Sequence, residues 1–124
     1  MDHELNVLGT PLEPCCYAPM TGYFRDGFCR TIQEDTGTHV VCAIVTEDFL
    51  EYTKSKGNDL STPLPYWNFP GLSPGDKWCL CVSRWLEVER VGKAPNILLE
   101  ATHAKALQYV SLEVLRKYEF VIPK

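Results

Sequence analysis

The chain has 124 residues, with 12 basic and 16 acidic side chains and a formal net charge of −4. This length favours a single domain over residues 1–124, and an apolar fraction of 45% is typical of a folded globular protein rather than a disordered chain. The acidic balance argues against a nucleic-acid partner, which needs a basic face, and against binding to an anionic membrane surface.

Two features of the sequence favour a location in the cytoplasm. No apolar run approaches the roughly 18 residues of a membrane span, and Met1-Asp2-His3-Glu4 lacks the basic start and apolar stretch of a secretory signal. We therefore expect a cytoplasmic protein with a mobile stretch at residues 1–5. Six cysteines make the chain cysteine-rich. Thiols stay free in a reducing cytosol, so this enrichment favours metal binding, thiol chemistry or plain burial.

The first forty residues predict loops and turns. Glycine and prolines between residues 6 and 19 exclude a helix and favour an extended lead-in. Within it Cys15 and Cys16 are adjacent, so in an extended chain they point to opposite faces and do not bind one ion together. Asp26-Gly27, flanked by aromatic residues, predicts a tight turn that could close a hairpin.

The next segment carries the clearest signals for regular structure. Residues 40–45 form an apolar, β-branched run that predicts a buried strand. Thr46 is expected to cap a helix over 47–56, with acids in its first turn, lysine in its last and glycine after it. Phe49, Leu50 and Thr53 should face the core.

Residues 58–75 predict a long ordered loop, rich in Pro, Gly, Asn and Ser and interleaved with Tyr66, Trp67 and Phe69. Loops of this length in a small domain are often functional. The aromatic residues fit either a rigid cover over the core or one wall of a binding groove.

The remainder alternates short elements. We expect a strand over 78–82, a helix over 84–91 capped by Ser83 (its alternating pattern also permits a strand), a strand over 97–101, a helical turn over 103–107 capped by Thr102, and a helix over 112–118 capped by Ser111. The chain as a whole predicts an α+β fold, with short strands in a mixed or antiparallel sheet and about three short helices.

Cys79 and Cys81 are the first candidates for chemistry. On a strand, residues two apart share a face about 6.6 Å apart at ~3.3 Å rise per residue. Their thiolates could meet on zinc or another thiophilic metal if a bulge brings them closer, although Cys-x-Cys is a weaker zinc signal than Cys-x-x-Cys. Further ligands would come from Cys29, Cys42, His39 or His103. His39 and Cys42 face opposite sides of a regular strand, so His39 joins only if it precedes that strand.

His103 supports a second hypothesis. A histidine at the first turn of a helix, near Cys79 or Cys81, could act as general base for a thiolate nucleophile in a Cys-His hydrolase or transferase. The alternative is a histidine that is hydrogen-bonded locally and has no catalytic role.

The aromatic loop around Tyr66 to Phe69 supports a third hypothesis, a non-catalytic binding module in which this loop forms a groove for a small molecule or a protein partner. Its candidate residues are Arg25, Asp26, Asp59, Trp67 and Arg84. The two arginines suit a carboxylate or phosphate, whereas an aspartate next to glycine or asparagine is more often a turn former. In this hypothesis the cysteines only pack.

Several blocks of the sequence resemble one family. They are Asn6-Val7-Leu8-Gly9 through Pro14-Cys15, Thr21 to Gly27, His39 to Ala43, Gly57 to Pro63, Phe69 to Leu72, Gly75 to Cys81, Arg84-Trp85 and Leu99 to His103. In this order, over roughly residues 6 to 118, they are similar to the uncharacterised bacterial domain-of-unknown-function family numbered 2237. The resemblance implies a small bacterial single-domain protein and a pattern with Cys15, Cys29, His39, Cys42, Cys79, Cys81 and His103 in common, whereas position 16 is usually not cysteine. It implies no activity.

Overall fold

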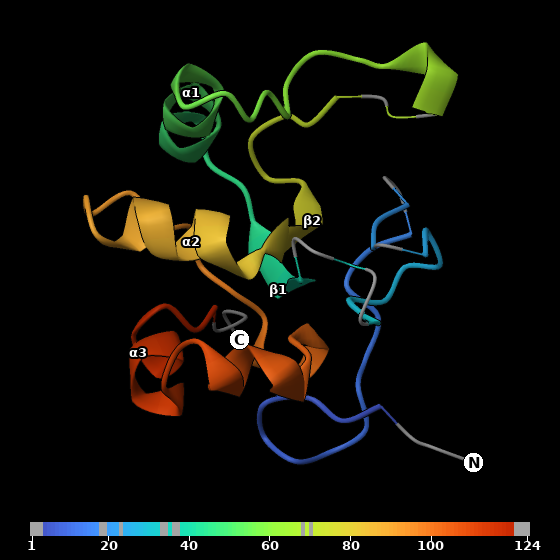
Figure 1. The fold of residues 1–124 in the computed structure, drawn as a ribbon, viewed down its shortest axis with the longest axis vertical. Coiled ribbons are helices and arrows are strands. Elements are labelled where there is room, and N and C mark those ends of the chain that lie inside the picture. Colours follow the sequence, from blue (N-terminus) through green and yellow to red (C-terminus); the bar gives the residue numbers. More distant parts are fainter. Residues whose placement is uncertain are drawn as a thin grey trace.

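The computed structural model describes residues 4–17, 20–22, 24–32, 35, 38–67, 69 and 71–120, and the side chain of Trp67 lies outside this description. In Figure 1 the three α-helices lie on one side of a short two-stranded sheet and the N-terminal segment, in blue, lies on the other. This is the α+β architecture that the sequence predicts. No helix in the described part of the chain has both the length and the apolar character needed to cross a membrane.

Two antiparallel strands form the centre of the fold. Strand β1 spans His39–Ile44 and strand β2 spans Lys77–Cys81, close to the predicted ranges. Cys42 lies opposite Cys79, and an irregularity in the register between His39 and Val41 leaves His39 opposite Cys81. The four central residues of β1 are all buried, as expected for a strand covered on both faces.

Helix α1, Glu47–Ser55, confirms the strongest local prediction. Thr46 has an extended backbone, and its hydroxyl accepts a 3.1 Å hydrogen bond from the Phe49 amide. Such a cap satisfies one of the amides that the first helical turn leaves without a partner. The buried residues of α1 are Phe49, Leu50 and Thr53, the three expected in the core.

Helix α2 begins earlier than the sequence predicts. It spans Val82–Glu89 and follows β2 without a linker, so it begins two residues before the predicted start at 84. Ser83 therefore lies inside the first turn and does not cap it, and Cys81 occupies the cap position with no side-chain cap bond. The inward positions Val82, Trp85 and Val88 follow helical spacing, which decides the helix over the strand.

The predicted strand over 97–101 is wrong. Ile97 makes only isolated bridges, to Ala43 and Glu119, after which the chain turns into the 3₁₀ helix η2, Leu99–Ala101. The Leu98 amide still bonds to the Cys42 carbonyl of β1, but the amides of Ala101 and Thr102 bond back to Leu98 and Leu99, so the chain turns away from the sheet. Another 3₁₀ helix, η3, spans Ala104–Gln108 and is capped by His103, not by Thr102 as predicted.

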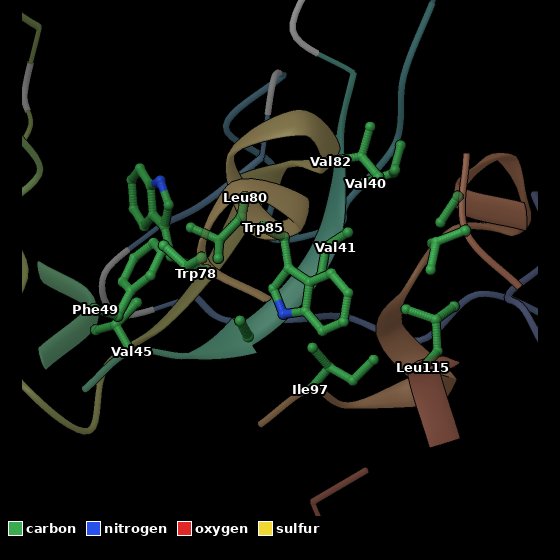
Figure 2. Packing of buried hydrophobic residues seen from close by; sticks show 14 of the residues in the cluster. Val40, Val41, Val45, Phe49, Trp78, Leu80, Val82, Trp85, Ile97 and Leu115 are labelled. Atoms are coloured by element: carbon green, nitrogen blue, oxygen red, sulfur yellow. The ribbon is translucent and has the colours of Figure 1, made fainter. Parts of the chain in front are cut away.

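Helix α3, Leu112–Lys117, is capped by the Ser111 hydroxyl, as predicted. Its Leu115 is fully buried in the main core, which gathers residues from β1, β2 and all three helices. Figure 2 shows Trp85 at the centre of this core beside Val41 and Ile97, with Phe49 and Trp78 grouped farther along it. The Trp85 indole also donates a 3.3 Å hydrogen bond to the Pro95 carbonyl.

The two irregular segments are tied to this framework. Asn6 is fully buried, and its amide group donates to the Thr10 hydroxyl and to the Glu100 carbonyl. Of the stretch expected to be mobile, residues 1–3 lie outside the described residues, while Leu5 forms a bridge to Pro11. In the described part of the 58–75 loop, the regular structure is the short 3₁₀ helix η1, Pro65–Trp67, and one bridge between Leu64 and Phe69.

Candidate functional site

Four cysteines from distant parts of the sequence gather in one buried cluster. The structure joins Cys15 to Cys42 and Cys29 to Cys79 as disulfides, with Cα–Cα distances of 5.7 and 5.3 Å. None of the four is more than 4% exposed, and Ala101 and Leu98 pack against them. We call these four residues the sulfur cluster. It differs from the free thiols expected of a cytoplasmic protein.

The two disulfides of the sulfur cluster are immediate neighbours. The Sγ atoms of Cys15, Cys29 and Cys79 all lie within 4.8 Å of one another, although Cys15 belongs to one disulfide and the other two to the second. Cys42 and Cys79 face each other across the β1–β2 ladder, where opposite Cβ atoms are about 4.5–5.5 Å apart. Three of the four sulfurs, those of Cys15, Cys29 and Cys79, therefore lie near a sulfur of the other disulfide.

Buried backbone hydrogen bonds position the cluster. The Cys42 amide donates to the Thr102 hydroxyl at 3.2 Å, and the Cys79 amide donates to the Thr21 hydroxyl at 2.8 Å. Both threonines are fully buried. The Cys15 amide donates to the Gly27 carbonyl at 2.7 Å, which closes the 15–27 loop against the sheet. The turn predicted at Asp26-Gly27 therefore helps to hold Cys15 in the sulfur cluster. It closes no hairpin, because the described part of this loop contains no pair of strands.

Cys16 and Cys81 are the free cysteines, and both are partly exposed. Cys15 is buried and bonded to Cys42, whereas its neighbour Cys16 is free and partly exposed. This agrees with the expectation that the two side chains point in opposite directions. Cys81 ends β2, and its Sγ lies 3.0 Å from the Ser83 hydroxyl. The structure thus places Cys79 in the sulfur cluster and Cys81 outside it.

His39 also lies outside the cluster, at the irregular start of β1, and its Nδ1 atom is 2.7 Å from a carboxylate oxygen of Asp35. Asp35 is 3% exposed and accepts further hydrogen bonds from the His39 amide and the Thr31 hydroxyl. Burial alone would raise the pKa of Asp35, but the hydrogen bonds and charge of His39 and the bond from Thr31 outweigh it and hold that pKa below 3.8.

We expect Asp35→Asn to lower the free energy of unfolding by about 1–3 kcal/mol at pH 7, because it removes charge-assisted hydrogen bonds from a buried group. A depressed pKa in the folded state contributes stability above the ordinary value of 3.8 and loses it as the pH falls through the folded-state pKa. The gap between variant and wild type should therefore be widest near neutrality and close below pH 3.8 in urea titrations. Glu51→Gln, on the exposed face of α1, is the control. A gap that stays constant down to low pH would contradict this role.

His103 lies in a different environment from the thiols. Its Nδ1 accepts a 2.9 Å hydrogen bond from the Lys105 amide, and its Nε2 bonds to the Glu4 carboxylate. An Nδ1 that accepts leaves the ring proton on Nε2, which donates to Glu4. His103 lines a cavity of about 680 Å³ with Asp35 and Tyr109, and no cysteine lines it among the described residues.

Two adjoining cavities lie beside β2. The larger, of about 370 Å³, is bounded by Arg25, by Phe69 and Trp78, and by Asn58, Asp59, Leu60 and Leu64 from the long loop. The smaller, of about 200 Å³, includes Cys81 and Arg84. His39 and Cys79 line both. The 58–75 loop thus lines a cavity through residues 58–60, Leu64 and Phe69.

The predicted binding residues divide into two groups. Asp26 is a turn former, since it accepts from the Phe28 amide and pairs with Arg30 at 2.6 Å. The Asp59 carboxylate accepts from the Thr62 hydroxyl and from the amides of the same turn, which lowers its pKa. Arg84 contacts Glu87 at 3.4 Å. Arg25 has no such carboxylate partner among the described residues.

The aromatic residues of the loop also differ in burial and in whether they line the larger cavity. Phe69 is buried against Trp78, with ring centroids 5.2 Å apart, and lines the larger cavity. Tyr66 is 98% exposed and does not line it. The predicted role of Trp67 falls on a side chain outside the described part of the structure.

Two contributors were missing from the sequence-based candidates, Cys15 and Asp35. Cys15 carried a usable signal, because the family resemblance places cysteine there and not at position 16. Asp35 carried none, since nothing in a polar loop marks one acid as buried.

These features define a small α+β domain whose irregular N-terminal segment is cross-linked to a two-stranded sheet. The chain belongs to the family described as "Uncharacterized protein conserved in bacteria (DUF2237)", whose model matches residues 5–119. This confirms the resemblance seen in the sequence. No curated protein matches the chain.

Proposed function

We propose that this is a cytoplasmic protein whose sulfur cluster is a redox-controlled metal site. Oxidised, the cluster holds two disulfides; reduced, its four thiolates bind zinc or another thiophilic ion. The observation that carries the proposal is the convergence of sulfurs from two different disulfides within 4.8 Å. Disulfides that serve only as cross-links have no need to lie side by side.

The size of the cluster supports a metal of this kind. Four thiolates at about 2.3 Å from a tetrahedral zinc ion lie about 3.8 Å from one another. Cys15 would therefore need to approach Cys29 and Cys79 by about 1 Å at most, while Cys29 and Cys79 would move apart once their own disulfide is reduced. Cys42, bonded to Cys15 in the oxidised state, would separate from it once that disulfide is reduced.

The chemistry balances with a thiol reductant of the cytosol. Each disulfide accepts two electrons and two protons and yields two thiols, while two reductant thiols become one disulfide. Four thiols then release four protons as they bind one divalent ion as thiolates. Disulfides in mesophile cytosol are usually transient or redox-sensing, so reversible opening of these two fits the proposed compartment.

Metal loading of single variants tests the ligand set. Protein reduced without oxygen and incubated with zinc should retain one ion per chain after gel filtration, as measured by elemental analysis. Serine substitution of Cys15, Cys29, Cys42 or Cys79 should lower retention at least tenfold. Cys16→Ser and Cys81→Ser are matched controls and should retain the ion, as should His39→Gln and His103→Gln.

The same variants distinguish a metal bound by the sulfur cluster from a metal bound by Cys81 or by the histidines that the sequence offered as ligands. Loss of zinc in Cys81→Ser or His39→Gln, with retention in Cys15→Ser, would replace the sulfur cluster by a site at the end of β2. Retention of less than a tenth of an equivalent by reduced wild-type protein would remove the metal site altogether.

A further inference from the structure

Arg25 is held in an unusual way. Its backbone has a φ of 55°, in the left-handed region that costs a non-glycine residue energy. Its guanidinium lies over the Trp78 ring at 5.1 Å from the centroid and 5.9 Å from that of Phe69. The aromatic rings fix the guanidinium at the edge of the larger cavity, so the strained turn presents a positioned cation.

The guanidinium has unused donors. Arg25 is exposed, and its N–H groups have no hydrogen-bond or carboxylate partner in the described part of the chain. The arginines at 30 and 84 are, by contrast, both paired with carboxylates. Asp59, the acid that lines the same cavity, is occupied by its own turn and does not pair with Arg25. A stacked guanidinium still offers its planar edge to a carboxylate in bidentate geometry.

The rest of the cavity is mainly apolar. Leu60 and Leu64 line it together with Phe69 and Trp78, and the Asn58 amide donates away from it, to the Thr53 hydroxyl. Its volume of about 370 Å³ falls in the range of small-molecule pockets, which combine apolar walls with a few placed polar groups. Room therefore exists for a ring or short chain beside the positive charge.

We propose that this cavity binds a small organic carboxylate with a flat apolar body. The carboxylate pairs with Arg25 and the apolar body lies against Leu60 and Leu64. Since the protein carries a net charge of −4, attraction of an anion depends on this one local cation. The proposal stands apart from the proposed function, because its test uses the oxidised, metal-free protein.

Benzoate is the probe and benzamide is its neutral match in shape. In heteronuclear NMR titrations, benzoate should shift the Trp78 indole signal and leave that of fully buried Trp85 in place. Benzamide and inorganic phosphate should each bind at least tenfold more weakly, because one lacks the charge and the other the apolar body. Equal binding of benzoate and benzamide, or of benzoate and phosphate, would overturn the proposal.

Arg25→Gln should weaken benzoate binding at least tenfold, and Arg25→Lys should fall between it and wild type, since lysine keeps the charge without the planar fork. Arg84→Gln, in the adjoining cavity, is the control and should leave the affinity within about twofold. Unchanged Trp85 signals verify that each variant is folded. Undiminished binding by folded Arg25→Gln would refute the assignment.

Discussion

Removing the Cys29–Cys79 disulfide by the double substitution Cys29→Ala and Cys79→Ala should lower the free energy of unfolding by about 2–5 kcal/mol. The bond links residues 50 apart in sequence, so it restricts the unfolded chain strongly, and it joins the irregular N-terminal segment to β2. Replacing both partners avoids leaving a lone thiol in the core. Urea denaturation without reductant measures the effect.

The same pair of proteins compared in reducing buffer supplies the decisive control. Once the wild-type disulfides are open, most of the difference should disappear, leaving only the loss of two buried sulfur atoms. The Cys16→Ala and Cys81→Ala double variant should resemble wild type in both buffers, because neither residue is cross-linked. Equal losses in oxidising and reducing buffer would show that Cys29 and Cys79 stabilise the fold by packing alone.

A comparably large loss, about 3–5 kcal/mol, is expected for Trp85→Ala. Trp85 has no exposed surface, meets the Tyr118 ring edge-on with centroids 5.1 Å apart, and lies among core residues of the sheet and helices (Figure 2). Truncation would leave a cavity, and it would leave the Pro95 carbonyl without the hydrogen bond that it accepts from the indole. The loss should be independent of reductant, unlike that of the disulfide variant.

Trp85→Phe is the graded control for this site. It retains an aromatic ring against Tyr118 but lacks the indole N–H, so we expect it to lose less than half as much stability as Trp85→Ala. Thermal or urea unfolding of the three proteins side by side gives the order. A loss below 1 kcal/mol for Trp85→Ala would contradict the central position of this residue, since buried tryptophan truncations cost about 3–5 kcal/mol.

Local signals predicted the regular elements where they agreed with one another. In the segment from β1 through α1, an apolar run, a threonine cap, acids in the first turn and a closing glycine all favour the same structure, and its buried residues were predicted individually. At 97–101 the composition favours a strand, but tertiary hydrogen bonds from β1 and from the residues after α3 determine the backbone. Propensity is overridden at such positions.

The candidate site was predictable in its residue types more than in its grouping. On a strand of period two, Cys79 and Cys81 are expected to point to the same face. In the structure α2 begins directly after Cys81, which leaves Cys81 at the end of β2 and outside the sulfur cluster. The disulfide partners, Cys29 and Cys15, come from loops whose path no periodicity describes. The cavity could be anticipated only in part, because Arg25 reaches it through a strained turn that the sequence does not mark.

Controlled oxidation of the zinc-loaded protein tests the central claim most directly. A disulfide oxidant added to reduced protein carrying one zinc should release that ion as four thiols disappear, and peptide mapping of the product should recover the Cys15–Cys42 and Cys29–Cys79 bonds. Release of zinc and formation of these two bonds should share one time course. Zinc that stays bound after both disulfides have formed, or oxidation confined to Cys16 and Cys81, would contradict a redox-controlled metal site in the sulfur cluster.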